Sequence, residues 1–262
     1  MEFKLINLFK KKEPAMQEQA EPYDPLDAEF SESEGTLICL TEKNILFVGN
    51  KGLIHKNSPT GSKAAFYRAG RLGMSGVECD LWESAHDDKG NFKLVISSNR
   101  TLPDARGSMK DISVLTPAGI DALPLIPSRN PDGPLHELCT LRKYLVVCAL
   151  YDMIPFITIR QGEFSDEAIE VMFSELKITC MENKAIIISR KPRVLRHIRH
   201  YARKNGCKKT RYMLNFEKNT SGHNRRDTSE LFELVEKYRI NGIRIHRDDL
   251  NDDMYKYCMD HN

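Results

Sequence analysis

The sequence contains no apolar run that approaches the roughly 20 residues of a membrane-spanning helix. Its first residues, MEFKLINLFKKK, also lack the basic start, apolar stretch and small-residue cleavage site of a secretory signal. The seven Cys are scattered, odd in number and include no Cys-x-x-Cys pair, which argues against a disulfide framework. We therefore expect a cytoplasmic protein with reduced, buried thiols.

The composition is that of a globular chain with an unusual beginning. Its 262 residues are 40% hydrophobic and carry a formal net charge of +2, which suits one soluble domain of barrel size or two small ones. Residues 1–12 carry several apolar side chains followed by three Lys. They form either an amphipathic helix for an anionic membrane surface or a frayed terminus. We expect a flexible or amphipathic segment over 1–34 and one folded domain over 35–262.

Predicted strands alternate with predicted helices along most of the chain. Apolar runs typical of strands lie at 52–55, 77–82, 155–160, 184–189, 211–216 and 242–246. Segments typical of helices follow at 62–72, 136–153, 166–177, 193–204, 229–238 and 252–258. This α/β alternation predicts a parallel sheet in a TIM-type (β/α) barrel. Residues 101–135 break the pattern because they are rich in Pro and lack helical periodicity, and we interpret them as a long excursion from the barrel.

Three side chains that could bind a metal or transfer a proton lie close together early in the predicted barrel. His55 ends the first predicted strand, and Glu78 and Asp80 lie two positions apart on the next. Because side chains alternate along a strand, both carboxylates point to the same side. Two carboxylates beside a strand-end His form a candidate site for a hard divalent cation. The alternative is an ion-paired cluster next to a His that only closes a strand.

The order and spacing of these residues resemble the glycerophosphodiester phosphodiesterase family. That family begins its barrel with a strand ending in His-Arg-Gly, followed by a Glu-Asn-Thr loop, a helix with Ala-Phe, and Glu-x-Asp on the second strand. The matching stretches here are His55-Lys56-Asn57, Thr60-Gly61-Ser62, Ala65-Phe66, Gly73, Glu78-Cys79-Asp80 and Ser98-Asn99. The resemblance covers residues 52–262. It implies a metal-dependent hydrolase that releases glycerol 3-phosphate and an alcohol from glycerophosphodiesters.

The resemblance also implies a role for each position that keeps the family's chemistry. His55 stands for one of two His that transfer protons. Lys56, next to His55, stands for a cation that is both catalytic and phosphate-binding, and Arg160 stands for a second phosphate-binding cation. Glu78 and Asp80 stand for two of the four carboxylates that hold Mg²⁺ or Ca²⁺ in the family.

Three matched positions depart from that chemistry. Thr60 and Thr158 stand where the family has Glu, and Ser98 stands where it has the second His. Hydroxyls are weak ligands for a hard cation, and Ser does not transfer protons near neutral pH. We therefore expect a weak or inactive phosphodiesterase of lipid metabolism. The alternative is a pseudoenzyme without a metal, which binds a phosphate-containing ligand, an anionic membrane surface or a protein partner.

The predicted barrel is incomplete. About six strand–helix units follow residue 52, whereas the family continues for two more strands and has a Trp-Thr-x-Asn run that is absent here. An open sheet has two edges with unpaired backbone groups. We expect these edges to be covered by an N-terminal hairpin, predicted over 36–40 and 45–48, or by a second copy of the chain in a homo-oligomer.

Residues 190–211 are strongly basic, with ten Lys or Arg, two His and no acidic residue. The charged side chains of the predicted helix over 193–204 lie opposite its apolar stripe, and they are Arg193, Arg196, His197, Arg199, Arg203 and Lys204. This is either a solvated face or a docking surface for an anionic partner. The one aromatic residue of the stretch, Tyr201, lies on the apolar side of the helix and not among the charged side chains, so nucleic acid is disfavoured. An anionic membrane surface is the expected partner, which would make the protein membrane-peripheral.

Overall fold

A largely parallel sheet forms the centre of the structure, a computed structural model that describes residues 36–40, 45–104, 106–126, 133–216, 228–245 and 251–260. The main path of the sheet has the order β1-β2-β3-β10-β11-β12-β13. Neighbours from β2 to β13 are parallel, and β1 pairs with β2 antiparallel. The bounds are β1 Thr36–Leu40, β2 Ile45–Gly49, β3 Gly76–Glu83, β10 Ile154–Ile159, β11 Ile186–Ser189, β12 Arg211–Phe216 and β13 Gly242–Ile245.

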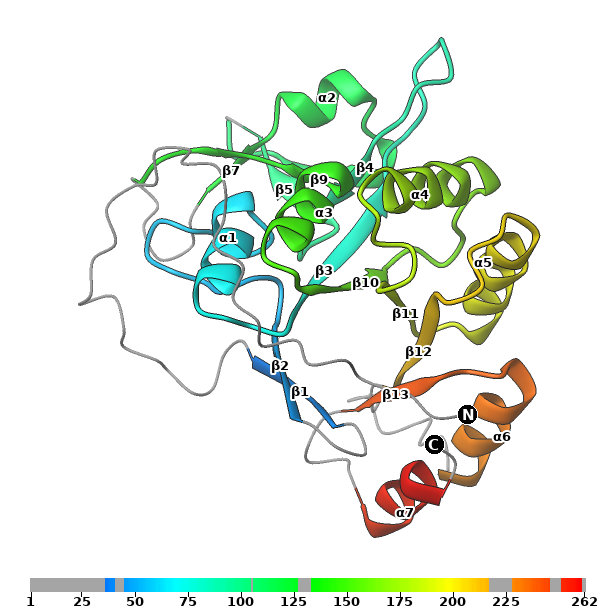
Figure 1. Ribbon diagram of the computed structural model, residues 1–262. Coiled ribbons are helices and arrows are strands. Elements are labelled where there is room, and N and C mark those ends of the chain that lie inside the picture. Colours follow the sequence, from blue (N-terminus) through cyan, green and yellow to red (C-terminus); the bar gives the residue numbers. More distant parts are fainter. Residues whose placement is uncertain are drawn as a thin grey trace. The chain divides into compact units, whose positions relative to one another are not determined.

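A helix lies between each parallel strand and the next one along the chain. The connections are therefore strand–helix–strand crossovers. The helices are α1 Lys63–Arg71, α3 Leu141–Leu150, α4 Asp166–Ile178, α5 Pro192–Lys204, α6 Thr228–Tyr238 and α7 Asp252–Asp260. Ser62, Thr140 and Ser165 begin three of them, because each side chain accepts a hydrogen bond from the backbone N–H three residues on. Figure 1 shows α1, α3, α4 and α5 along the same side of the sheet.

Both faces of the sheet are buried, which explains why its strands are nearly continuous apolar runs. On the outer face, Val77 and Leu81 of β3 belong to the large core shared with the helices. On the inner face, Phe156 of β10 belongs to a separate, smaller apolar cluster. Glu78 and Asp80 alternate with the outer residues of β3 and are therefore on the inner face. The fold thus places both carboxylates inside the curve of the sheet.

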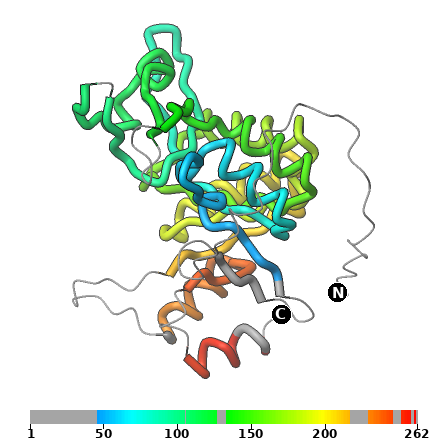
Figure 2. Tube along the Cα trace, turned by 90° about the vertical axis from the view of Figure 1, so that its left-hand side faces the viewer, coloured from blue at the N-terminus to red at the C-terminus, as the bar shows by residue number. Residues whose placement is uncertain are grey.

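Between β3 and α3 the chain forms a small subdomain with its own core (Figure 2). Its elements are β4 Leu94–Ile96, β5 Thr101–Pro103, β6 Met109–Asp111, the 3-10 helix η2 Ile112–Val114, α2 Pro117–Asp121, β7 Pro124–Leu125, β8 His136–Glu137 and β9 Cys139–Thr140. Its buried residues are Trp82, Val95, Leu102, Ile112, Ile120, Leu123, Leu125 and Leu138. The excursion predicted over 101–135 is confirmed, and it is a folded unit that β4 anchors to β3.

Two local predictions are wrong. The first parallel strand is β2, Ile45–Gly49, and not residues 52–55. The chain leaves the sheet at Lys51 and Gly52, whose φ angles of 59° and 80° are incompatible with a continuing strand. Residues 136–153 are also not one helix, because Thr140 caps α3 and the preceding residues form β8 and β9.

The predicted hairpin is confirmed by the antiparallel pairing of β1 with β2, in which Leu40 is the partner of Ile45. Cys79, Cys139, Cys148 and Cys207 are buried, as expected, whereas Cys180 is exposed. The described elements belong to one compact unit, Glu32–Asn262, whereas the segment predicted over 1–34 lies outside the described residues. Within the described ranges, no helix has the length and apolar character to cross a bilayer.

Candidate functional site

The inner-face side chains of β3 and β10 meet at the carboxyl end of the sheet. Glu78 is fully buried, and Asp80 and Thr158 are each 1% exposed. The strand register places Asp80 beside Thr158, with Glu78 one step deeper beside Phe156. Two carboxylates that are shielded from solvent in this way need partners, because burying an unpaired charge costs a large amount of free energy. Their partners therefore define what this site can do.

Glu78 is paired with one cation and one hydroxyl. Thr158 donates its hydroxyl to Glu78 Oε1 at 2.7 Å. Arg244, an inner-face residue of β13, forms an ion pair with the same oxygen through Nη1. Burial raises the pKa of Glu78, and Asp80 adds to this, although Arg244, Thr158 and Lys51 lower it. Glu78 is thus held by contacts that span the inside of the sheet from β3 to β13.

Asp80 is paired with two cations. Lys51, just after β2, places Nζ 3.0 Å from Asp80 Oδ2. Arg160, just after β10, places Nε 3.5 Å from Asp80 Oδ1. Arg190, just after β11, also lies in this group, because burial and then repulsion by Arg160 lower its pKa while Asp80 raises it. Basic residues that follow three parallel strands therefore converge on one buried carboxylate.

Unsatisfied polar atoms concentrate at the same place. Among the described residues, seven buried side-chain oxygens have no hydrogen-bond partner, and five of them belong to four residues here: Asn50, Glu78, Asp80 and Ser98. The two oxygens of Asp80 have only the ion pairs with Lys51 and Arg160. Asn50 comes one residue after the register pair of Gly49 with Val77, and so lies next to Glu78 across the strands. Ser98 follows Ser97, whose backbone N–H donates to the Asp80 carbonyl at 3.1 Å. Such clustering marks a site that a ligand or water completes.

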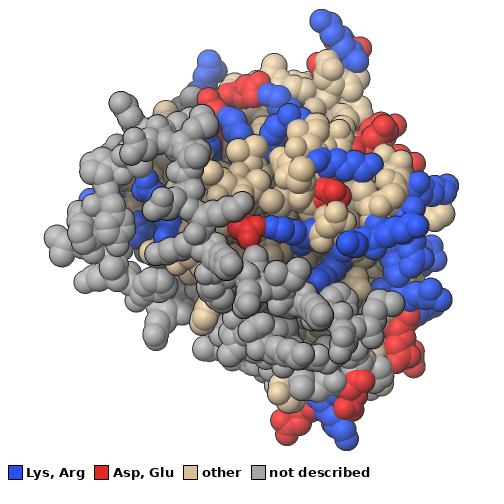
Figure 3. Space-filling model, in the orientation of Figure 1, with Lys and Arg blue, Asp and Glu red and all other residues tan. Residues whose placement is uncertain are grey.

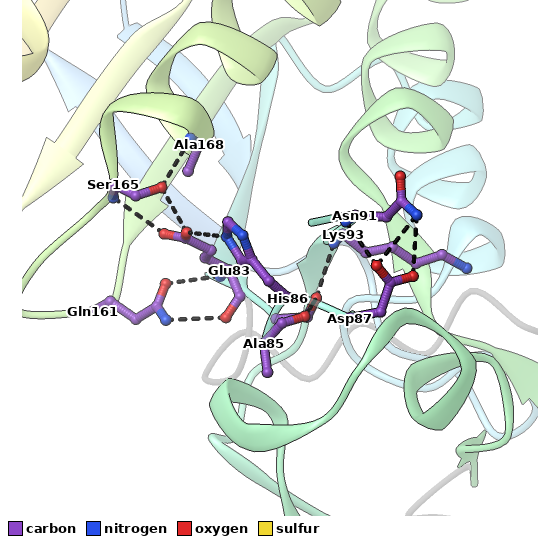
Figure 4. Close-up of polar contacts among 10 residues, drawn as sticks. Glu83, Ala85, His86, Asp87, Asn91, Lys93, Gln161, Ser165 and Ala168 are labelled. Atoms are coloured by element: carbon purple, nitrogen blue, oxygen red, sulfur yellow. Dashed lines mark hydrogen bonds and ion pairs between the residues drawn. The ribbon is translucent and has the colours of Figure 1, made fainter. Parts of the chain in front are cut away.

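A polar clamp fixes the loop that forms the wall of the site (Figure 4). Gln161 exchanges two hydrogen bonds with the Glu83 backbone, at 2.7 and 3.0 Å. The Glu83 carboxylate accepts hydrogen bonds from Ser165, from Oγ at 2.6 Å and from the backbone N–H at 3.1 Å. His86 Nε2 lies 3.6 Å from the same carboxylate. These contacts connect the end of β3 to the start of α4. They hold the loop between β10 and α4 in place.

A cavity of about 750 Å³ opens at this end of the sheet. Its walls come from the strand ends and from the subdomain, and include Trp82, Arg100, Ser113, Thr158, Arg160, Gln161, Arg190 and Lys191. This volume is in the range of small-molecule sites. Four of the wall residues are basic and one, Glu163, is acidic, so the described lining has an excess of positive charge that suits an anionic ligand.

The donor set does not fit the divalent cation that the family resemblance implies. Mg²⁺ and Ca²⁺ require about six or more oxygen ligands. Glu78 and Asp80 are already engaged by basic side chains, and Thr158 supplies only a hydroxyl where the family has a Glu. Throughout the described part of the chain, no three His, Cys, Asp or Glu side chains are grouped as metal ligands. These residues favour a bound anion over a bound cation.

The structure brings together only part of the predicted site. Glu78, Asp80, Thr158 and Arg160 meet as expected, and Ser98 lies at the adjoining end of β4. Thr60 lies in the loop before α1, where the neighbouring Gly61 approaches Ile96 and Ser97 of β4 and its extension. The metal-binding and phosphate-binding roles given to these residues stay predictions.

His55 and Lys56 lie away from the strand end that suggested their roles. His55 and Ser58 exchange backbone hydrogen bonds of 3.3 and 3.1 Å in the turn before α1, and Lys56 is exposed. The strand that precedes them ends at Gly49, so Asn50, Lys51 and Gly52, and not His55 and Lys56, follow directly on the first parallel strand. The signal was present, because an apolar run leads directly into these residues.

Lys51 and Arg244 are functional candidates that the sequence interpretation missed. Lys51 was hidden by the choice of the wrong first strand. Arg244 lies in the short strand Gly242–Ile245 and carries no motif. Only the curvature of the sheet, which brings β13 opposite β3, reveals its pairing with Glu78.

Comparison with known proteins finds structural relatives only. No family model matches the chain, and no curated protein sequence matches it. A Silicibacter pomeroyi protein assigned as a glycerophosphoryl diester phosphodiesterase is 17% identical, with a TM-score of 0.64 over 81% of this chain and 78% of that one. An Agrobacterium tumefaciens protein with the same assignment is 14% identical, with a TM-score of 0.62 over 81% and 80%.

A third solved structure is an Oleispira antarctica phosphodiesterase in complex with its product sn-glycerol-3-phosphate. It is 16% identical, with a TM-score of 0.60 over 81% of this chain and 79% of that one. The predicted TIM-type α/β fold is therefore confirmed, with six parallel strands among the described residues. The chain has the fold of the glycerophosphodiester phosphodiesterases, and the resemblance first seen in its motifs is confirmed at the level of that fold.

Proposed function

We propose that this protein is a non-hydrolysing relative of the glycerophosphodiester phosphodiesterases. It binds a small phosphate-bearing ligand at the carboxyl ends of its parallel strands and does so without a divalent cation. The structural relative from Oleispira antarctica is a phosphodiesterase bound to sn-glycerol-3-phosphate, which motivates the choice of ligand class. We also propose a cytoplasmic location, in keeping with the unpaired buried thiols.

The pairing of Glu78 and Asp80 with basic side chains carries this proposal. Two carboxylates share their surroundings with four cations, Lys51, Arg160, Arg190 and Arg244. Four positive charges minus two negative charges leave an excess of two positive charges around the carboxylates. Arginine and lysine at such a site suit the oxygen atoms of a phosphate group. A metal at the same place would first have to displace these partners.

The residues at the two proton-transfer positions also support the absence of hydrolysis. By the strand position, Asn50 takes the place of the family's first His, and Ser98 takes that of the second. Neither side chain exchanges a proton near neutral pH. Losing general acid–base groups typically costs on the order of 10² to 10⁴ in rate. Binding needs neither group, and so it survives these replacements.

The test is a calorimetric titration with sn-glycerol 3-phosphate in the presence of a chelator. We expect saturable binding that Arg160→Gln weakens by roughly ten- to a hundredfold, because a hydrogen bond to a charged group is lost. Arg193→Gln is the matched control, since Arg193 is an exposed Arg on α5 and does not line this cavity. No binding in chelator would contradict the proposal.

A parallel assay measures release of glycerol 3-phosphate from glycerophosphodiesters with Mg²⁺, with Ca²⁺ and with chelator. We expect the wild type to match the background of Asp80→Asn in every condition. Metal-dependent release that Asp80→Asn abolishes would establish a working phosphodiesterase instead.

A further inference from the structure

A second, smaller cavity lies at the opposite end of the sheet from the strand-end site. It has a volume of about 70 Å³ and lies where the last turns of α5 meet the first residues of β12. The residues that line it include Arg199, Arg203, Lys208, Tyr212 and Asn241. The space is several times what one water molecule needs. It is large enough for a small tetrahedral anion.

The local chain path explains why these residues converge. Gly206 has a φ of 82°, a left-handed conformation that ends α5 and favours Gly. The Cys207 backbone N–H then donates to the Ala202 carbonyl at 2.9 Å and folds the chain back over the helix end. Lys208 is thereby brought alongside Arg203 and Arg199 of the helix. Three cations from the basic stretch thus meet at one small space.

Acidic partners for these cations are absent from the part of the chain that the structure describes. Within the described ranges, no ion pair joins Arg199, Arg203, Lys208 or Arg239 to a carboxylate. Burial lowers the pKa of Arg199, and so does repulsion by Arg203 and Arg239. Figure 3 shows Lys and Arg gathered on the side of the molecule where Figure 1 draws α5. Like charges held together in this way are stabilised when an anion binds between them.

Arg199 is fixed in position by the end of α6. Its Nη1 donates to the Tyr238 carbonyl at 3.0 Å and also to the Arg239 carbonyl. Its guanidinium lies 6.0 Å from the centre of the Tyr212 ring. The side chain is therefore pre-organised, and its other N–H groups remain for a ligand.

Tyr212 supplies an independent indication of a ligand. The side chain is only 4% exposed, yet its hydroxyl has no hydrogen-bond partner among the described residues. Its backbone N–H is held by Asn241 Oδ1 at 3.0 Å, which fixes the residue in place. Burial raises the pKa of the Tyr212 phenol, so the hydroxyl stays protonated and can donate. Buried hydroxyls normally have a partner, and this one lines a cavity surrounded by cations.

The carboxylate of Glu182 acts on Cys207, a wall residue of this cavity. Burial raises the pKa of Cys207 and Glu182 adds to this, although Lys177 lowers it. Glu182 is not among the described wall residues. Thr210 donates its hydroxyl to the Glu182 carbonyl at 2.8 Å, which holds this residue behind the loop. The wall residues that the structure describes therefore include no acidic side chain.

We propose that this cavity is a binding site for a phosphate monoester group. Arg199, Arg203 and Lys208 neutralise the phosphate, and the Tyr212 hydroxyl donates a hydrogen bond to one of its oxygens. Arginine and lysine side chains recognise phosphate through such charge-assisted hydrogen bonds. The site is separate from the strand-end cavity and shares no wall residue with it.

Tyr212→Phe is the sharpest variant, because it removes only the hydroxyl. Without ligand, we expect it to melt at or above the wild-type temperature, since an unsatisfied buried group is lost. With inorganic phosphate as the titrant, we expect binding at this site to weaken roughly ten- to a hundredfold. Lys208→Gln should weaken the same binding step, and Arg193→Gln, on the same helix but outside the cavity, should leave it unchanged.

Two further comparisons separate this site from others and identify the source of the phosphate. Arg160→Gln, which changes the strand-end cavity, should not alter the step that Tyr212→Phe weakens. Sedimentation with phosphatidylcholine vesicles, with and without phosphatidic acid, tests the lipid source. Retention that needs both phosphatidic acid and the Tyr212 hydroxyl assigns a lipid headgroup, and phosphate binding without retention assigns a soluble ligand. Unchanged phosphate affinity in Tyr212→Phe, or a lower melting temperature without ligand, would overturn the proposal.

Discussion

Glu78 shows how much of the environment of a buried carboxylate is decided by its partners. In the resemblance it is a metal ligand, and here it accepts a hydrogen bond from Thr158 and pairs with Arg244. The sequence predicted that Glu78 and Asp80 would share a face, because strand alternation is a local property. It did not predict their partners, because Lys51 and Arg244 reach them only through the curvature of the whole sheet.

The raised pKa of Glu78 predicts a pH dependence of stability. Between its ordinary value of 4.5 and the raised value, folded Glu78 keeps a proton that the unfolded chain has lost. The free energy of unfolding therefore falls as the pH rises through this window. Glu78→Gln should not show this fall. The free energy of unfolding of the variant should therefore rise relative to that of the wild type as the pH increases. Denaturant unfolding of both proteins at a series of pH values measures this, and parallel curves would contradict it.

Strand β2 is the element that the sequence misplaced. Its apolar run was recognised, but it was assigned to a hairpin outside the barrel. The structure gives it both roles, because β1 pairs with one edge and β3 with the other. Most other elements were predicted within a few residues, since their periodicity and caps are local signals. Ser165 before α4 is an example, as its side chain accepts from the Ala168 N–H at 3.0 Å.

Substitutions in β2 test its place in the core. Val48 is 1% exposed and lies in the inner cluster, whereas the neighbouring Phe47 is 53% exposed. Val48→Ala should lower the free energy of unfolding by about 1–3 kcal/mol. Phe47→Ala is the matched control and should change it by less than about 0.5 kcal/mol. If thermal or denaturant unfolding shows the reverse order, β2 does not form the inner wall of the sheet.

At the scale of the whole molecule, ion pairs inside the sheet engage the two carboxylates that the resemblance assigns to a metal. Their partners come from three other parallel strands or the turns after them, so we expect the fold to keep its integrity without a cation. The homo-oligomer considered from the strand count stays a prediction. Among the described strands, β1 and β13 end the sheet and no ladder joins them.

Metal addition and removal should therefore leave thermal stability unchanged. A cation bound at 100 times its dissociation constant would add about 2.7 kcal/mol of stability. For a domain of this size that corresponds to a rise in melting temperature of roughly 5–10 °C. We expect no shift of this size with Mg²⁺, Ca²⁺ or chelator in differential scanning calorimetry. A rise with either cation that Asp80→Asn removes would show that the carboxylates do hold a metal.

The ion pair between Glu78 and Arg244 has a consequence for folding during synthesis. It joins residues 166 positions apart, and a ribosome adding about 5–20 residues per second needs roughly 10–30 s to cover that distance. During this interval the Glu78 carboxylate has no contact with Arg244 of β13. A nascent chain that stops short of β13 lacks Arg244, so its Glu78 can be buried only with its proton or must stay hydrated. The closing of this contact thus distinguishes a chain that has reached β13 from one that stops before it.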